Sequence, residues 1–234
     1  MLKCSLRKWI FIPRCMACDA VLNDEEFDGG FCPACSPALL PWPLPQCRSC
    51  GALIAPGKHV LCGTCIVRPF SLSYSRSAFV YGGPIRAAIL RWKGKGAYGA
   101  GTRELVHLVE SVNRAPNDSA DLWIPIPPSR SLQRHRDFVP TYELCRTLSL
   151  RQGRPSNISH ALIETHRTGT GVAARRHYAI QRDVRGCRIL LIDDVRTTGS
   201  SSNAAAKSLI QAGAKEVGLW TLARTPQAHE ASPF

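Results

Sequence analysis

The sequence predicts an α/β fold that is built on a parallel sheet and preceded by a small cysteine-rich module. Two observations lead to this prediction. From residue 71 onward, apolar strand-like runs alternate with helix-spaced segments, an order typical of parallel strands joined by helices. Before residue 71, four CxxC pairs follow one another, a spacing typical of metal-binding knuckles. We therefore expect two domains, residues 1–70 and residues 71–234.

The elements of the larger domain follow from apolar spacing and from breaks at Pro and Gly. A helix is expected at 83–93, where Ile85, Ala88, Ile89 and Trp92 recur at helical spacing. The continuous apolar run at 188–194 indicates a strand buried on both faces. The other expected elements are a strand at 78–81, a helix at 102–112, a strand at 121–127, a helix at 141–150, a strand at 158–165, a loop at 165–187, a helix at 201–214 and a strand at 217–224.

The eight paired cysteines predict two closed metal sites. Two residues between cysteines let a tight turn direct both sulfur atoms at one ion, and a second knuckle completes a tetrahedral thiolate shell. A disulfide framework would need an oxidising compartment, and a redox role would need only one pair. We expect two structural Zn²⁺ ions, with sequential pairing favoured over interleaved pairing. The expected ligands are Cys15, Cys18, Cys32, Cys35, Cys47, Cys50, Cys62 and Cys65.

The chain is strongly basic, with a formal net charge of +13. This excess predicts an anionic partner, although an ordinary basic surface is the plainer alternative. Arginine supplies the positive charge of residues 130–185, which contain no lysine, and its planar guanidinium suits bidentate contacts with phosphate. No apolar run approaches the roughly 18 residues that a membrane span needs. We therefore expect a cytoplasmic protein without a membrane span.

The stretch ILLIDDVRTTGSS, residues 189–201, reads as strand, loop and helix start. Backbone N–H groups and hydroxyls of Thr197, Thr198, Gly199, Ser200 and Ser201 can surround a phosphate, helped by the helix dipole. The adjacent carboxylates of Asp193 and Asp194 would repel that phosphate, so we expect them to accept hydrogen bonds from a sugar diol or to hold Mg²⁺. Phosphate at one end and a diol at the other describe a ribose 5-phosphate.

Three alternatives explain this stretch less well. A Walker loop requires a lysine after the glycine, where this chain has Ser200. A receiver domain carries its paired acids near its beginning, and only forty residues follow Asp194 here. A purely structural turn needs neither the diacid nor the Thr-Thr-Gly-Ser sequence before a helix.

The stretch resembles the signature of type I phosphoribosyltransferases, which bind 5-phosphoribosyl 1-pyrophosphate with magnesium. This resemblance implies a parallel-sheet type I phosphoribosyltransferase-like domain. It implies that Asp193 and Asp194 are the catalytic carboxylates that hold the ribose hydroxyls, and that residues 197–201 hold the 5-phosphate. It also implies that Mg²⁺ bridges the pyrophosphate and that a mobile loop closes over the site.

The whole chain resembles the ComF family, which joins cysteine-rich zinc ribbons to a phosphoribosyltransferase domain. The segment FVYGGPIRAAILRWKGKG resembles the family's strand–helix–lysine segment, with Lys93 at the matching lysine. The segment IPIPPSRSLQRHRDF resembles its proline loop and the arginine element that follows. The matching positions are Pro125, Pro127, Arg134, Arg136 and Phe138, whereas Asp137 and Val139-Pro140 depart from the pattern.

Two functions are consistent with this resemblance. In the first, the chain binds 5-phosphoribosyl 1-pyrophosphate with Mg²⁺ and transfers its phosphoribosyl group, with Lys93, Pro127, Arg134, Arg136 and either Arg175 or Arg176 contacting the substrate. In the second, the chain is a non-catalytic adaptor that binds single-stranded DNA or a competence helicase through its ribbons and basic surface. ComF proteins are associated with DNA uptake in natural transformation, so both functions can serve that process.

Overall fold

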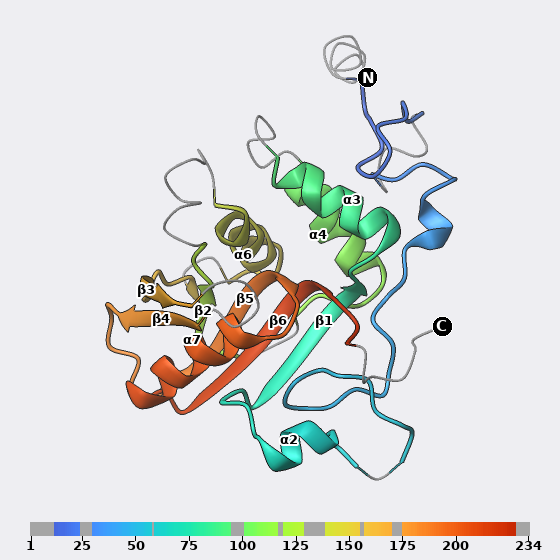
Figure 1. The fold of residues 1–234 in the computed structure, drawn as a ribbon. Helices are drawn as coiled ribbons and strands as arrows, with labels where there is room; N and C mark the ends of the chain where they lie inside the picture. Colours follow the sequence, from blue (N-terminus) through green and yellow to red (C-terminus); the bar gives the residue numbers. More distant parts are fainter. Residues whose placement is uncertain are drawn as a thin grey trace.

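Four parallel strands form the central sheet, in the order β1-β6-β5-β2 (Figure 1). Their bounds are β1 Tyr74–Val80, β2 Leu122–Pro125, β5 Arg188–Arg196 and β6 Glu216–Arg224. The computed structural model describes residues 12–23, 30–57, 59–94, 101–116, 119–128, 139–154, 157–169 and 175–227. The predicted parallel α/β sheet is confirmed, and β1 begins four residues before the expected strand at 78–81.

Both faces of the sheet are covered, as the continuous apolar run of β5 predicts. One face packs against helices α3, Gly83–Trp92, α4, Thr102–Ser111, and α6, Pro140–Arg151, through a core that contains Leu190 and Ile192. The other face packs against helix α7, Ser200–Gln211, through a core that contains Ile189 and Leu191. Successive β5 side chains therefore alternate between two cores, as strand geometry requires. Within the described parts of the chain, no helix is both long enough and apolar enough to cross a membrane.

A β-hairpin replaces most of the loop expected at 165–187. Strands β3, Leu162–Thr168, and β4, Arg175–Ile180, pair antiparallel and form a separate two-stranded sheet. The polar composition of both strands explains the wrong prediction, because only a few of their side chains are buried. Leu162 and Tyr178 join the core under α7, so the hairpin covers the same face of the large sheet as that helix.

The cysteine-rich segment covers the free edge of β1 (Figure 1). Pro41 forms an antiparallel bridge with Phe79, and the Trp42 N–H donates to the Ala78 carbonyl at 2.9 Å. The Ser75 N–H donates to the Arg48 carbonyl at 2.8 Å. Unpaired edge strands expose backbone groups that can pair with other chains, and these contacts satisfy them internally.

Arg224 of β6 makes two further contacts with this segment. The Trp42 ring is fully buried, and its Nε1 donates to the Gly51 carbonyl at 3.0 Å. The buried Arg224 guanidinium lies 5.1 Å from the Trp42 ring centroid and donates to the Cys50 carbonyl at 3.1 Å. Met16 and Phe31 also belong to the core that contains α3 and α4. Part of the cysteine-rich segment thus packs into the same core as α3 and α4.

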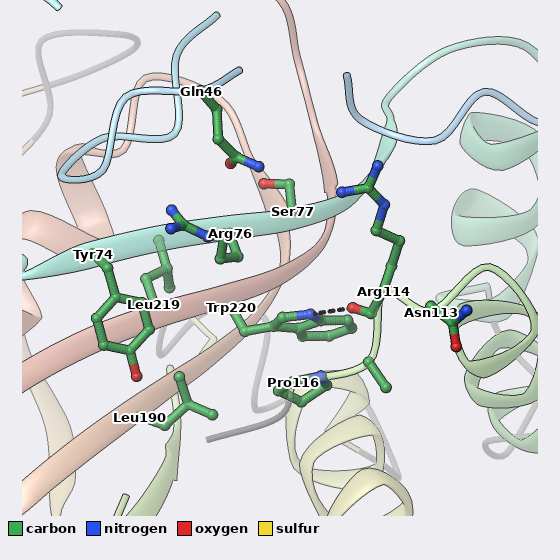
Figure 2. A pocket seen from close by; sticks show the side chains of 11 residues that line it. Gln46, Tyr74, Arg76, Ser77, Asn113, Arg114, Pro116, Leu190, Leu219 and Trp220 are labelled. Atoms are coloured by element: carbon green, nitrogen blue, oxygen red, sulfur yellow. Dashed lines mark hydrogen bonds between the residues drawn. The ribbon is translucent and has the colours of Figure 1, made fainter. Parts of the chain in front are cut away.

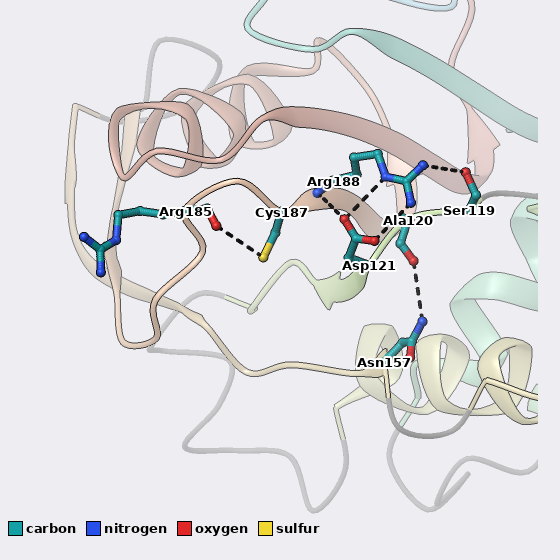
Figure 3. A network of polar contacts seen from close by, with 7 residues as sticks. All are labelled: Ser119, Ala120, Asp121, Asn157, Arg185, Cys187 and Arg188. Carbon is teal, nitrogen blue, oxygen red and sulfur yellow. Dashed lines mark hydrogen bonds and ion pairs between the residues drawn. The ribbon is translucent and has the colours of Figure 1, made fainter.

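A polar network fixes the register at the beginnings of β2 and β5 (Figure 3). Arg188 donates to Asp121 through its backbone N–H at 2.8 Å and through its guanidinium Nη2 at 3.0 Å. The side-chain and backbone hydrogen bonds from Arg188 lower the pKa of Asp121. Arg188 Nη1 also donates to the Ser119 hydroxyl at 3.1 Å. Because the pair is exposed, its contribution to stability is modest and its main effect is to align the two strands.

Candidate functional site

The candidate phosphate loop connects the end of β5 to the beginning of α7. Gly199 is the N-cap of α7 and has φ +78°, a left-handed conformation that glycine adopts without strain. Thr197, Thr198 and Ser200 are exposed, and Ser201 is half-buried. The Thr198 hydroxyl donates to the Ser200 hydroxyl at 3.2 Å. This arrangement presents hydroxyls at a helix N-terminus, where the backbone N–H groups and the helix dipole favour an anion.

A buried arginine lies directly beneath this loop. A Cβ atom at position 199 would overlap the Arg196 guanidinium, so the close approach requires glycine. Arg196 is 3% exposed, and its Nη1 donates to the Ser75 hydroxyl at 3.2 Å. Its guanidinium also lies 5.1 Å from the Phe70 ring centroid. Arg196 therefore holds a positive charge in a fixed position below the turn.

The two aspartates that precede the loop face opposite sides of the sheet. Asp194 points toward α3, and the Lys93 Nζ lies 2.7 Å from its Oδ1. Asp193 belongs to the face covered by the hairpin, because neighbouring strand residues alternate in direction. The Asp194 N–H donates to Asp193 Oδ1 at 2.9 Å, which fixes the first carboxylate. The predicted residues Lys93, Asp193 and Asp194 are thus brought together.

Asp193 lies in an environment that opposes its ionisation. Burial, together with the charge of Asp194, raises the pKa of Asp193 to about 7, although Lys93 and Arg176 act in the opposite direction. Burial also raises the pKa of the neighbouring Tyr178 to about 12. A carboxyl group with such a pKa changes its charge near neutrality, and groups of this kind are frequent in functional sites.

Arg176 connects the hairpin to the proline loop after β2. Its Nη1 lies 3.3 Å from Oε2 of the buried Glu164 and donates to the Pro127 carbonyl at 3.3 Å. The sequence left Arg175 and Arg176 as alternatives. Arg176 makes these contacts, and the side chain of Arg175 lies outside the described part of the structure. Glu164 was not predicted, because its role depends on the hairpin. The predicted residues Arg134 and Arg136 lie outside the described residues.

The donor set suits Mg²⁺ as well as a diol. Asp193 and Asp194 are consecutive carboxylates in the last part of β5, and Mg²⁺ is usually held by one or two carboxylates together with water and substrate phosphates. Lys93 and Arg176, on the two sides of the diacid, offer cations for an anionic ligand. The site can therefore accept a molecule that carries both hydroxyls and phosphate.

The cysteines form two four-sulfur clusters with sequential pairing. Cys15, Cys18, Cys32 and Cys35 make one cluster, and Cys47, Cys50, Cys62 and Cys65 make the other. In each, the Sγ atoms lie within 4.8 Å of one another. The Cys18–Cys32 and Cys50–Cys62 sulfur distances are 3.7 and 3.6 Å. Tetrahedral zinc with Zn–S bonds of about 2.3 Å places its sulfurs about 3.8 Å apart, so both clusters fit structural Zn²⁺.

Backbone N–H groups in these knuckles stabilise thiolates. Burial raises the pKa of Cys15, but N–H groups of Cys18, Cys32 and Ala17 more than offset it and lower the pKa to about 6. The Cys32 N–H lies 3.4 Å from the Cys15 sulfur. The pKa of Cys47 is lowered to about 7 in the same way. Burial raises the pKa of Cys35, Cys50 and Cys65, so the backbone contacts favour the thiolate, the form that zinc binds, at one cysteine of each cluster.

Comparisons with known proteins give a family match to the first part of the chain. They also give a relative that is similar over most of the chain. The family described as double zinc ribbon domain matches residues 6–66. The DNA utilization protein YhgH of Escherichia coli O157:H7 is 27% identical over 210 residues, which cover 84% of this chain and 91% of that protein. The cysteine clusters and the family match agree that the chain begins with a double zinc ribbon.

Several solved structures are similar to part of the chain. The allosteric regulatory enzyme of purine biosynthesis has 19% identity and a TM-score of 0.36, with 52% of this chain and 25% of that chain covered. Hypoxanthine phosphoribosyltransferase from Trypanosoma cruzi has 14% identity and a TM-score of 0.33, with 57% and 70% covered. Purine phosphoribosyltransferase from Pyrococcus horikoshii has 15% identity and a TM-score of 0.32, with 61% and 93% covered.

Proposed function

We propose that this ComF-like chain, in which a double zinc ribbon precedes a phosphoribosyltransferase-like parallel sheet, binds 5-phosphoribosyl 1-pyrophosphate. The observation that carries the proposal is the order of groups along β5 and α7. Two carboxylates lie near the end of the strand, and a glycine turn with exposed hydroxyls precedes the helix. Asp193 and Asp194 are assigned to the ribose hydroxyls, and residues 197–201 are assigned to the 5-phosphate.

The pyrophosphate end is assigned to the cations on both sides of the diacid. Lys93 contacts Asp194 from α3, and Arg176 reaches the proline loop from the hairpin. A pyrophosphate that leaves the ribose needs positive charge fixed in advance, because charge develops there while the sugar becomes oxocarbenium-like. The chemistry that Mg²⁺ supplies when bound is further neutralisation of that charge. Asp193 and Asp194 would hold the ion, and phosphoribosyl transfer is the reaction this arrangement supports.

Isothermal titration calorimetry with 5-phosphoribosyl 1-pyrophosphate and Mg²⁺ tests the proposal. We expect a binding signal that the double variant Asp193→Asn/Asp194→Asn weakens by at least about tenfold, which corresponds to about 1.4 kcal/mol. Asp183→Asn is the matched control, because Asp183 is exposed and pairs only with Arg185 in the described part of the chain. An absent signal, or equal affinity in the double variant and the control, would contradict the proposal.

A second candidate function is binding of single-stranded DNA as an adaptor. The name of the E. coli relative and the net charge of +13 support it. Binding of a fluorescent oligonucleotide should weaken steeply as salt increases, because phosphate contacts release counterions. Measuring anisotropy across a salt series checks this expectation. Binding that is absent, or that salt does not affect, would leave the ribbons without a role on DNA.

A further inference from the structure

A cavity of about 370 Å³ lies beside the first halves of β1, β5 and β6 (Figure 2). Leu190, Leu219 and Trp220 border it and are almost completely buried. Gln46 reaches it from the cysteine-rich segment, and Arg114 reaches it from the turn after α4. Its volume is within the range of small-molecule sites, roughly 300–1,000 Å³. None of its lining residues belongs to the phosphate loop or the diacid.

The polar lining of this cavity is positively charged. Arg76 and Arg114 enter from opposite sides, with the Trp220 indole below them (Figure 2). No Asp or Glu lines the cavity, and neither arginine makes an ion pair with another described residue. Two guanidinium groups without a carboxylate favour an anionic ligand.

Among the remaining lining residues, Tyr74 favours a ligand with a flat ring. Trp220 is held in place because its Nε1 donates to the Arg114 carbonyl at 2.8 Å. Tyr74 can lie flat on the sheet because its ring covers Gly218, where a Cβ atom would overlap it. The half-buried Tyr74 therefore offers aromatic surface to a ligand, whereas Trp220 is almost completely buried and helps to hold the Arg114 turn in place.

We propose that this cavity binds a small aromatic anion, a flat heterocycle that carries a phosphate or carboxylate group. The anionic group lies between Arg76 and Arg114, and the ring lies against Tyr74. Nucleoside monophosphates have this chemistry. The site is independent of the proposed ribose 5-phosphate site, because the two share no residue.

The test uses the full-length zinc-loaded protein and adenosine 3′-monophosphate, whose phosphate is not on the 5′ carbon. The NMR signal of the Trp220 Nε1–H reports directly on the cavity. We expect the probe to shift this signal, and we expect Arg76→Gln/Arg114→Gln to weaken binding by at least about tenfold. Arg103→Gln is the control, because Arg103 is an exposed arginine on the helix that leads into the cavity turn. Adenosine and inorganic phosphate, each alone, should bind more weakly than the combined probe.

Three results would overturn this proposal. The first is a Trp220 signal that the probe leaves unchanged. The second is equal binding in the double arginine variant and the Arg103→Gln control. The third is adenosine binding as tightly as its monophosphate, because the anion would then contribute nothing. The variant Asp193→Asn/Asp194→Asn should bind the probe normally, so failure of this proposal and failure of the proposed function give different results.

Discussion

Gly199 is the residue on which the geometry of the phosphate loop depends most directly. Its positive φ and its closeness to the Arg196 guanidinium each exclude a side chain. Arg196 cannot move aside freely, because the Ser75 hydroxyl and the Phe70 ring hold it in a buried position. The sequence predicted a glycine turn here, but the arginine beneath it could only be found from the structure.

Gly199→Ala should lower the free energy of unfolding by about 2–4 kcal/mol. The left-handed backbone accounts for about 1–2 kcal/mol, and displacement of a buried side chain accounts for the rest. Gly153→Ala is the matched control, because Gly153 has φ +68° and nothing within 4 Å of the added carbon. Urea unfolding of both variants measures the difference. Equal losses in the two variants would mean that Arg196 does not constrain the loop.

The raised pKa of Asp193 predicts a pH-dependent stability. A carboxyl group whose pKa is about 7 when folded and near 4 when unfolded keeps a proton that the unfolded chain releases. Its contribution to stability is therefore fully present below about pH 4 and is lost as the pH rises toward 7. The variant Asp193→Asn lacks this pH dependence. As the pH rises from about 4 to about 7, its free energy of unfolding should therefore increase relative to that of the native protein by on the order of 2 kcal/mol.

Urea unfolding at about pH 5 and at about pH 7.5 measures this effect. Asp183→Asn is the control, because hydrogen bonds from Arg185 lower the pKa of Asp183 to about 2 and it stays ionised throughout. The free energy of unfolding of this control should differ from that of the native protein by the same amount at both pH values. A difference for Asp193→Asn that also stays constant would show that Asp193 is ionised in the ordinary way.

At the scale of elements, the sequence predicted the features that depend on residues close together in the chain. The helical spacing of α3 and the CxxC spacing of the knuckles follow from residues a few positions apart, and both were found. The β3–β4 hairpin was not predicted, because its strands expose polar residues and depend on pairing across the chain. For the same reason, the contact of Arg176 with the Pro127 carbonyl could not be predicted from spacing.

Cys62→Ser should reduce the zinc content from two ions to one. Cys62 belongs to the second cluster, and a zinc site that loses one of four thiolates binds its metal far less tightly. Cys187→Ser is the matched control, because Cys187 is a partly exposed cysteine that lies outside both clusters. Mass spectrometry under native conditions counts the ions. Two ions retained in both variants would contradict the four-cysteine assignment.

At the scale of the whole molecule, the cysteine-rich segment and the sheet support each other. The segment pairs with the free edge of β1, and Arg224 connects the second cluster to β6. The separate domains expected at 1–70 and 71–234 stay a prediction. Met16 and Phe31 share a core with α3 and α4, and the Arg224 guanidinium lies over the Trp42 ring. The sequence could not reveal this sharing, because it depends on contacts between distant segments.

Loss of the second zinc site should therefore expose the edge of β1. In Cys62→Ser we expect faster hydrogen exchange at the Ser75 N–H, whose acceptor is the Arg48 carbonyl between two zinc ligands. Exchange at the Ile126 N–H, which donates to the Ile192 carbonyl elsewhere in the sheet, should not change. NMR-detected exchange measures both amides. Unchanged exchange at Ser75 would show that the edge is held without the metal.

The central claim is that the loop after β5 holds the phosphate of a ribose 5-phosphate while the diacid holds its hydroxyls. The most direct measurement is a titration of the ¹⁵N-labelled protein with ribose 5-phosphate, followed through the backbone amide signals. We predict that the signals of residues 198–201 shift, that ribose alone shifts them far less, and that Asp193→Asn/Asp194→Asn weakens the effect. Signals that stay in place at millimolar ribose 5-phosphate, or that shift equally with ribose, would contradict the account.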